Sequence, residues 1–276
     1  MRISGVGHGL FAIAVAGLGI LNLVFGNFAP IWEPFPAWLP RPEIWASGSG
    51  VMLLGAGAGL LLARTARASA ILIGVYLSVW VIARARPVLL QPPAVGSWYA
   101  LGEALAPLLG AWILYAVLLR PDEARAATGM SGHRAQCAAR ALFGAACVMY
   151  GAAHFAYAAY TASLVPVWLP ARTGFAYLTG AGHAAAGLGL LMGVLPRLAA
   201  TLEAVMMSLF GVLVWFPSFF AQPVPKWATP LQNQWSETVV TCLLAASAWI
   251  VAASLRSSPW GLRPRAASPA ILRGDR

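Results

Sequence analysis

The sequence predicts an all-α integral membrane protein with eight transmembrane helices, arranged as two parallel four-helix-bundle repeats. Three observations lead to this fold class: the composition, the length of the apolar runs and an internal repeat. Of 276 residues, 60% are hydrophobic and 9% are charged. A soluble domain has about 25% charged residues, so this chain has too few polar side chains to cover a water-exposed surface. The composition excludes a soluble enzyme, a disordered protein and a disulfide scaffold.

Eight stretches are long and apolar enough to cross a bilayer. A transmembrane helix needs about 20 predominantly apolar residues, and these runs lack the alternation of barrel strands. The predicted spans are 6–28, 43–63, 68–86, 98–119, 137–161, 174–194, 198–216 and 235–255. The first run follows Arg2 and resembles a signal peptide, but it has a counterpart in the fifth run, so we expect a retained helix.

The chain contains an internal repeat. Residues 36–61 match residues 166–191 at eleven of 26 positions. Further along the chain, after a small insertion in the second copy, Glu103 is aligned with Glu237. Because each repeat holds an even number of spans, both enter the membrane from the same side, related by a pseudo-twofold axis along the membrane normal. The predicted parts are a first repeat (1–119), a cytoplasmic linker (120–136), a second repeat (137–256) and a basic cytoplasmic tail (257–276).

Basic residues predict the orientation. With the N-terminus inside, thirteen lie on the inner side and five on the outer side, which is a positive-inside bias. Both termini are therefore expected in the cytoplasm. Because the charges lie at the ends of apolar runs, the net charge of +10 indicates contact with a lipid bilayer and not with nucleic acid. Arginine outnumbers lysine 17 to 1, which is typical of a GC-rich bacterial genome and predicts a bacterial inner (plasma) membrane protein.

The sequence predicts neither a disulfide nor a metal site. Cys137, Cys147 and Cys242 form no C-x-x-C pair, so we expect free thiols. The four histidines include no pair at i, i+4, and we expect no cysteine at ligand spacing beside them.

A Pro-x-Trp-Leu-Pro element occurs twice, at 36–40 and 166–170. Proline fixes φ, so each copy predicts a stiff outer cap in which two prolines bracket a tryptophan that anchors the cap at the membrane boundary. Together with three further segments, the second copy of this element resembles DoxX-like membrane proteins. The segments are Phe175-Ala176-Tyr177-Leu178-Thr179-Gly180, Gly151-Ala152-Ala153-His154-Phe155 and Asn233-Gln234-Trp235-Ser236-Glu237. The resemblance covers about 140–255 and is weaker over the first repeat. The resemblance implies a four-span bundle and, from some relatives, a membrane subunit in thiosulfate:quinone oxidoreduction or a partner in thiol and oxidative-stress complexes. This chain has His183 where such proteins often have an acidic residue.

Ionisable side chains inside a span are expensive and mark candidate functional sites. His154 lies on a polar stripe of the fifth span, and Glu237 starts a second stripe on the eighth. Since a helix rises about 1.5 Å per residue, the two could meet in the outer half of the second bundle. A His–carboxylate pair suits proton exchange with a quinol, so His154 and Glu237 are the candidate catalytic residues. The alternative is a bond that only holds two helices together.

Four further residues are candidates to contact a bound quinone: Tyr150, Tyr157, His183 and Trp168. A structural hydrogen bond is the alternative role for His183. Glu203 is expected to pair with an arginine at the inner boundary or to stay protonated. In the first repeat the position equivalent to His154 is occupied by Val24. We therefore expect only the second bundle to be active, and a change at Glu103 in the first bundle to affect activity less.

Three functions remain open from the sequence. The leading one is an accessory or membrane subunit of a redox process, quinone-linked and with a redox partner protein. The others are a carrier for a small molecule or ion, and a non-catalytic scaffold or assembly factor. The sequence does not decide whether the protein is an enzyme.

Overall fold

A computed structural model describes residues 4–261, which form helices and connections without a strand. The α-helices in this part of the chain are α1 (Val6–Phe25), α2 (Pro42–Leu60), α3 (Ala66–Leu90), α4 (Val95–Val117), α5 (Pro121–Ala126), α6 (His133–Ala156), α7 (Ala158–Leu164), α8 (Arg172–Met192), α9 (Pro196–Phe210), α10 (Phe216–Ser218) and α11 (Leu231–Ser254). A π-helical turn, η2 (Gly211–Trp215), joins α9 to α10, and two short 3-10 turns, η1 (Gly129–Ser131) and η3 (Lys226–Ala228), lie in connections.

Several helices are long and apolar enough to cross a bilayer. Six candidates are α1, α3, α4, α8, α11 and the continuous helix from Pro196 to Ser218, and α6 with α7 makes a seventh if this bent pair is one span. The predicted second span corresponds to α2, which does not qualify because its 19 residues include five glycines, two serines and a glutamate. The chain is therefore an all-helical, multi-pass membrane protein.

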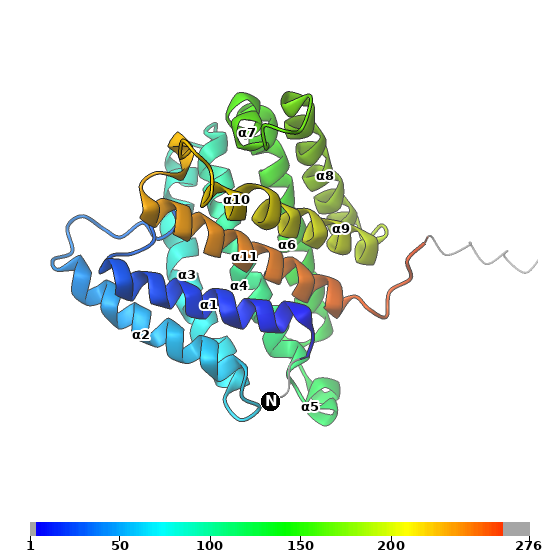
Figure 1. The fold of residues 1–276 in the computed structure, drawn as a ribbon. Helices are drawn as coiled ribbons and strands as arrows, with labels where there is room; N and C mark the ends of the chain where they lie inside the picture. Colours follow the sequence, from blue (N-terminus) through cyan, green and yellow to red (C-terminus); the bar gives the residue numbers. More distant parts are fainter. Residues whose placement is uncertain (1–3, 262–276) are drawn as a thin grey trace, which may run out of the picture.

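The long helices form two sets that cross each other (Figure 1). One set contains α1, α2, α9 and α11, and the other contains α3, α4, α6 and α8. Helix α1 packs on α2 and on α11, while α4 packs on α3, α6 and α11. Each set thus combines a hairpin from the first half of the chain with one from the second, so the two halves interlock, whereas the sequence repeat predicts a separate bundle for each.

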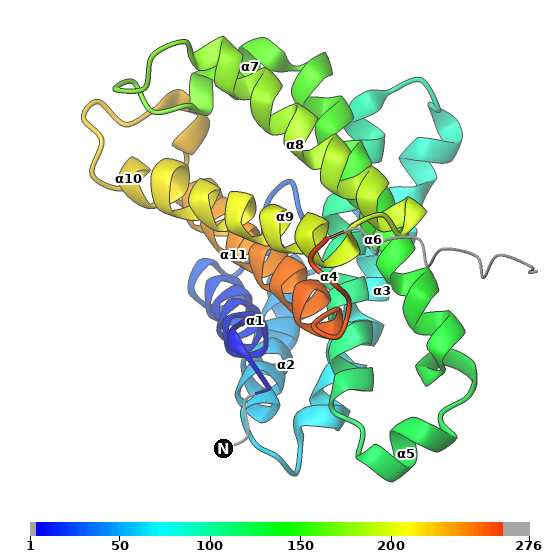
Figure 2. The same ribbon diagram turned by 90° about the vertical axis from the view of Figure 1, so that its right-hand side faces the viewer.

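The connections alternate between two sides of the molecule. Segments 26–41, 91–94, 165–171 and 219–230 lie to the left and top of Figure 1, on what we call the α7 side. Segments 61–65, 118–132 and 193–195 lie to the right and bottom, on the α5 side, as do both ends of the described chain. Figure 2 shows the same separation of α7 and α5 from a perpendicular direction. Every long helix therefore runs from one side to the other.

Close glycine contacts join the first two long helices of each half. A Cβ at Gly57 would lie 2.7 Å from the Ala12 carbonyl oxygen, and a Cβ at Gly187 would lie 2.5 Å from the Gly144 carbonyl oxygen. Such approaches need a residue without a side chain. Gly57 and Gly187 occupy the same place in the sequence repeat, whereas Gly144 lies two positions beyond the counterpart of Ala12. The packing therefore matches each residue of α6 with the residue of α1 that lies 132 positions earlier, whereas the sequence repeat matches residues 130 positions apart.

Some predicted boundaries differ from the structure. The predicted fifth span, 137–161, is broken at Tyr157, where α6 and α7 meet at 95°. At this break the Tyr157 hydroxyl oxygen accepts a hydrogen bond from the Gly96 N–H (3.0 Å), which connects the bend to the start of α4. Helix α6 begins at His133, inside the predicted linker 120–136. Of the predicted tail 257–276, residues 262–276 lie outside the described part of the chain.

Candidate functional site

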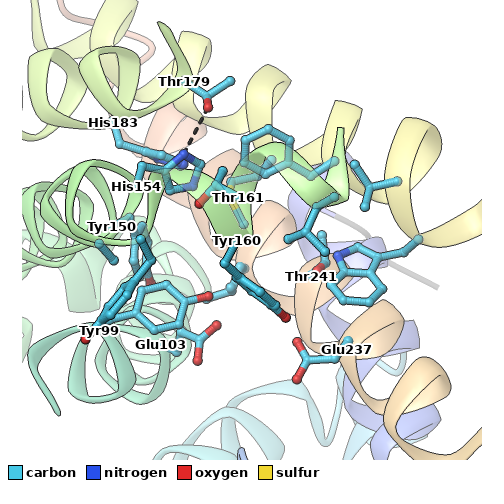
Figure 3. Close-up of a pocket in the computed structure, with 18 of the residues that line it drawn as sticks. Tyr99, Glu103, Tyr150, His154, Tyr160, Thr161, Thr179, His183, Glu237 and Thr241 are labelled. Atoms are coloured by element: carbon cyan, nitrogen blue, oxygen red, sulfur yellow. Dashed lines mark hydrogen bonds between the residues drawn. The ribbon is translucent and has the colours of Figure 1, made fainter. Parts of the chain in front are cut away.

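A cavity of about 210 Å³ lies between α4, α6, α7, α8, the α9–η2 segment and α11 (Figure 3). An apolar cavity of about 150 Å³ binds benzene, so this cavity has room for one substituted ring. Its lining consists of Tyr99, Glu103, Tyr150, Ala153, His154, Tyr157, Tyr160, Thr161, Leu164, Val165, Thr179, His183, Met207, Phe210, Val214, Trp215, Glu237, Thr241 and Leu244.

The structure brings five of the six predicted site residues to this cavity. They are His154, Glu237, Tyr150, Tyr157 and His183. Trp168 does not line it, because it lies in the connection between α7 and α8 with 68% of its surface exposed. With this exposure Trp168 is not packed against the rest of the protein, and its role as an anchor at the membrane boundary stays a prediction.

His154 is oriented by a threonine of the neighbouring helix α8. The Thr179 hydroxyl donates to the Phe175 carbonyl oxygen (2.8 Å), so it accepts from the Nδ1–H of His154 (2.9 Å). This leaves Nε2 unprotonated, and Nε2 has no hydrogen-bond partner within residues 4–261. His154 and Glu237 face the same cavity without a hydrogen bond between them, so they are not a pair that holds two helices together.

Behind His154, His183 forms a buried pair with Glu203. His183 Nδ1 lies 2.9 Å and 3.0 Å from the two carboxylate oxygens, and both side chains are 1% exposed. Glu203 thus pairs with a histidine on α8 and not with the arginine expected at the inner boundary.

Aromatic rings surround the two imidazoles. The ring centroids of His154 and His183 are 5.0 Å apart, and Phe210 lies 6.0 Å and 5.7 Å from them. The Tyr150 ring packs edge-on against His183, and its O–H donates to the Gly102 carbonyl oxygen (2.9 Å). The imidazoles are therefore held rigidly, because each has a fixed ring packing and a fixed polar partner.

The opposite end of the cavity is acidic. Figure 3 shows the carboxyl groups of Glu103 and Glu237 facing the same space below Tyr160. The two carboxyls are close enough to interact electrostatically, and Arg84 interacts with both. Tyr99 is a hydrogen-bond partner of Glu103. The expectation that Glu103 lies in a separate bundle from Glu237 is wrong, because α4 and α11 pack against each other and bring both glutamates to one cavity. The pairing of Glu103 with Glu237 in the repeat was the signal that could have indicated this. The smaller effect expected for a change at Glu103 stays a prediction.

The corresponding place in the first half is filled. With the register found in the packing, His154 corresponds to Asn22 and not to Val24, and Asn22 Nδ2 donates to Ser49 Oγ (3.2 Å) as His154 does to Thr179. Glu33, from the connection after α1, is buried beside this pair and accepts a hydrogen bond from Tyr76. Phe28 packs against Phe35 and Trp80 and completes the filling.

Two helix irregularities lie next to the cavity. Val214 and Trp215 of the π-turn η2 line it, as do Tyr160 and Leu164 of α7 beyond the 95° break. π-turns occur frequently at functional sites, and broken helices form the binding sites of many transporters. The cavity is thus built where two helices depart from regular geometry.

One spacing was overlooked in the sequence. His133 and Cys137 are four residues apart at the start of α6, and Nε2 lies 3.5 Å from Sγ, so a cysteine does stand at ligand spacing from a histidine. Within residues 4–261 no group of three or more His, Cys, Asp or Glu side chains could hold a metal ion.

Comparisons of the chain with models of protein families, with curated proteins and with solved structures found no match. The resemblance to DoxX-like proteins therefore depends on the sequence motifs alone. Any functional argument has to come from the chemistry of the cavity.

Proposed function

We propose that this chain is a DoxX-like membrane component of a redox process in the bacterial inner membrane, and that its cavity binds the ring headgroup of a quinol or quinone. The observation that carries the proposal is the cavity of about 210 Å³ with aromatic walls, His154 at one end and Glu237 with Glu103 at the other. Ligand sites are mostly apolar with a few well-placed polar groups, and this arrangement fits a flat ring with oxygens at two opposite edges.

The polar groups supply what quinol chemistry needs from a protein. A quinol loses two protons as it loses two electrons, so each hydroxyl needs an acceptor. At one edge of the ring the unprotonated Nε2 of His154 accepts a hydrogen bond from the hydroxyl, and at the other edge the carboxyl pair accepts the proton. The electrons pass to a disulfide or metal centre of a redox partner protein.

Binding of short-tailed ubiquinone and menaquinone analogues to the purified protein in nanodiscs tests this proposal. We expect His154→Ala, Glu237→Gln and also Glu103→Gln to weaken binding at least 10-fold without a large fall in melting temperature. Glu43→Gln, at the exposed start of α2, is the matched control and should bind as the wild type does. Unchanged binding in His154→Ala and Glu237→Gln would refute the quinone site.

We also propose the finer topology of eight spans in two tandem repeats, with the α5 side and both termini in the cytoplasm. The alternating connections support this topology. Two equivalent helix starts support the repeat: Arg41 directly before α2 and Ala171 directly before α8 both have left-handed φ (55° and 49°). These two residues occupy the same place in the sequence repeat. In a background without native cysteines, Gln222→Cys should be labelled from outside by an impermeant maleimide and Ser131→Cys should not. Outside labelling at residue 131 would overturn the topology.

A small-molecule carrier is the second candidate. It is favoured by the two broken helices at the cavity and by the convergence of glutamates from equivalent helices of the two halves. Protein-dependent solute uptake into liposomes without any redox partner would support the carrier against the quinone-linked function.

A further inference from the structure

The buried pair of His183 and Glu203 has no role in the function proposed above. Its geometry is well defined, because Nδ1 of His183 is almost equidistant from both oxygens of Glu203 (2.9 Å and 3.0 Å). An N–H shared by two carboxylate oxygens has this geometry, whereas the O–H of a carboxylic acid would favour a single oxygen. We infer from this geometry that the pair is an Nδ1–H donating to a carboxylate, which leaves Nε2 as the ring nitrogen available to a ligand of the cavity.

Packing alone does not require this pair. At the equivalent positions the first half has Leu53 and Ile73, which are 1% and 0% exposed on α2 and α3. The same helix packing is thus achieved with two apolar side chains. Replacing a buried ion pair by apolar residues is often neutral or stabilising, so a pair kept only for stability would be a poor choice. The charged pair occurs in the half that supplies most of the residues lining the cavity.

The two cavity histidines have different second partners. His154 donates its Nδ1–H to a neutral hydroxyl, that of Thr179, while His183 donates to a carboxylate. An imidazolium formed at His183 is stabilised by the negative charge of Glu203, as in the His–Asp unit of serine proteases. Hydrogen bonds to charged groups are roughly twice as strong as neutral ones. Of the two histidines, His183 is therefore the one whose protonated ring would have a negative charge directly beside it.

We propose that His183 is the proton acceptor for a phenolic hydroxyl bound in the cavity, and that Glu203 is its positioning residue. In this step the phenol O–H bond breaks, a bond forms between the proton and Nε2, and the electron pair stays on the phenolate oxygen. No electrons are transferred, so no oxidant is needed. His154 acts as a hydrogen-bond partner of the ring and not as its base. The inference deepens the proposed function, since it assumes a ring ligand with an acidic hydroxyl.

The probe for this step is 4-nitrophenol, whose phenolate absorbs visible light while the neutral phenol does not. Absorbance is recorded on the protein in nanodiscs one pH unit below the midpoint of the free probe's titration, where about one tenth of the free probe is ionised. We expect the wild-type protein to bind the probe mainly as phenolate. His183→Gln should lose the phenolate band of the bound probe, and Glu203→Gln should reduce the ratio of phenolate to phenol at least 10-fold.

Three further variants keep the test decisive. The double variant His183→Leu/Glu203→Ile copies the first half, so it should fold and should bind the probe only as neutral phenol. His154→Gln should weaken affinity and keep the ratio of phenolate to phenol, and Glu43→Gln should change neither. Any of three results would overturn the proposal. The phenolate band could survive in the double variant, it could disappear in His154→Gln but not in His183→Gln, or it could be absent from the wild type.

The outcome is independent of the quinone test. A protein that ionises 4-nitrophenol but binds no quinone analogue would retain His183 as the acceptor and lose the quinone-linked function. A protein that binds quinone analogues but not the phenolate would lose only this inference.

Discussion

The buried carboxyl of Glu33 makes stability depend on pH. Glu33 lies in the connection between α1 and α2, is 3% exposed, and accepts hydrogen bonds from the Ala29 N–H (2.7 Å) and the Tyr76 hydroxyl. Burial raises the pKa of Glu33 from 4.5 to about 7, although these hydrogen bonds and one from Asn22 act to lower it. The folded protein therefore holds this proton more tightly than the unfolded chain does.

The sign and size of the effect follow from linkage. Below about pH 4.5 the carboxyl is protonated in both states and the stabilisation is fully present. As pH rises from 4.5 through 7 the unfolded chain releases the proton first, so the free energy of unfolding falls. A raise from 4.5 to about 7 at 1.36 kcal/mol per pKa unit corresponds to about 3 kcal/mol. At 2–4 °C per kcal/mol for a chain of this size class, the melting temperature should fall by roughly 6–12 °C.

Glu33→Gln isolates this contribution. Glutamine resembles the protonated acid and does not titrate, so the variant should lose this part of the pH dependence and be more stable than the wild type at pH 8. Melting temperatures in detergent at half-unit steps from pH 4.5 to 8 measure it, and Glu43→Gln should follow the wild-type curve. Parallel curves for the wild type and Glu33→Gln would show that the linkage argument is wrong.

Two predictions concern packing. Gly187→Ala should destabilise the protein by about 1–3 kcal/mol, because the added Cβ would lie 2.5 Å from the Gly144 carbonyl oxygen. Gly48→Ala is the control and should not destabilise the protein, because no atom lies within 4 Å of its added Cβ. Equal melting temperatures for the two variants would contradict the close contact of α6 and α8. Trp168→Ala should cost less than about 1 kcal/mol since Trp168 is 68% exposed, while Trp80→Ala, at 5% exposure, should cost about 3–5 kcal/mol. The reverse order in thermal unfolding would mean that the caps are packed after all.

The length of the apolar runs predicted the long helices, because a bilayer demands about 20 apolar residues whatever their partners are. It could not predict the break at Tyr157, where the side chain contacts Gly96, a residue 61 positions away. It also placed α2 among the spans, although this helix has too many small and polar residues to qualify by composition.

The candidate site was predicted in part. A polar residue in an apolar span stands out in one dimension, and so His154, His183 and Glu237 were recognised. Their partners were not, because partners are set by which helix faces meet. The pairing of His183 with Glu203 requires the packing of α8 on α9. The place of Glu103 beside Glu237 requires the halves to interlock, and its one signal in the sequence was that the two glutamates occupy equivalent positions in the repeat.

The interlocked helices have a consequence for biogenesis. Helix α1 is buried by α11: a Cβ at Gly7 would lie 2.7 Å from the backbone nitrogen of Ile250, and the Gln232 amide donates to the Phe28 carbonyl oxygen (3.2 Å). During synthesis the first helix leaves the ribosome long before this partner exists. Its inner face must remain against lipid, the insertion machinery or a chaperone until the last span arrives. Cutting the chain at the linker between α4 and α6 would yield two fragments that each lack a neighbour, and they would have to be made together to assemble.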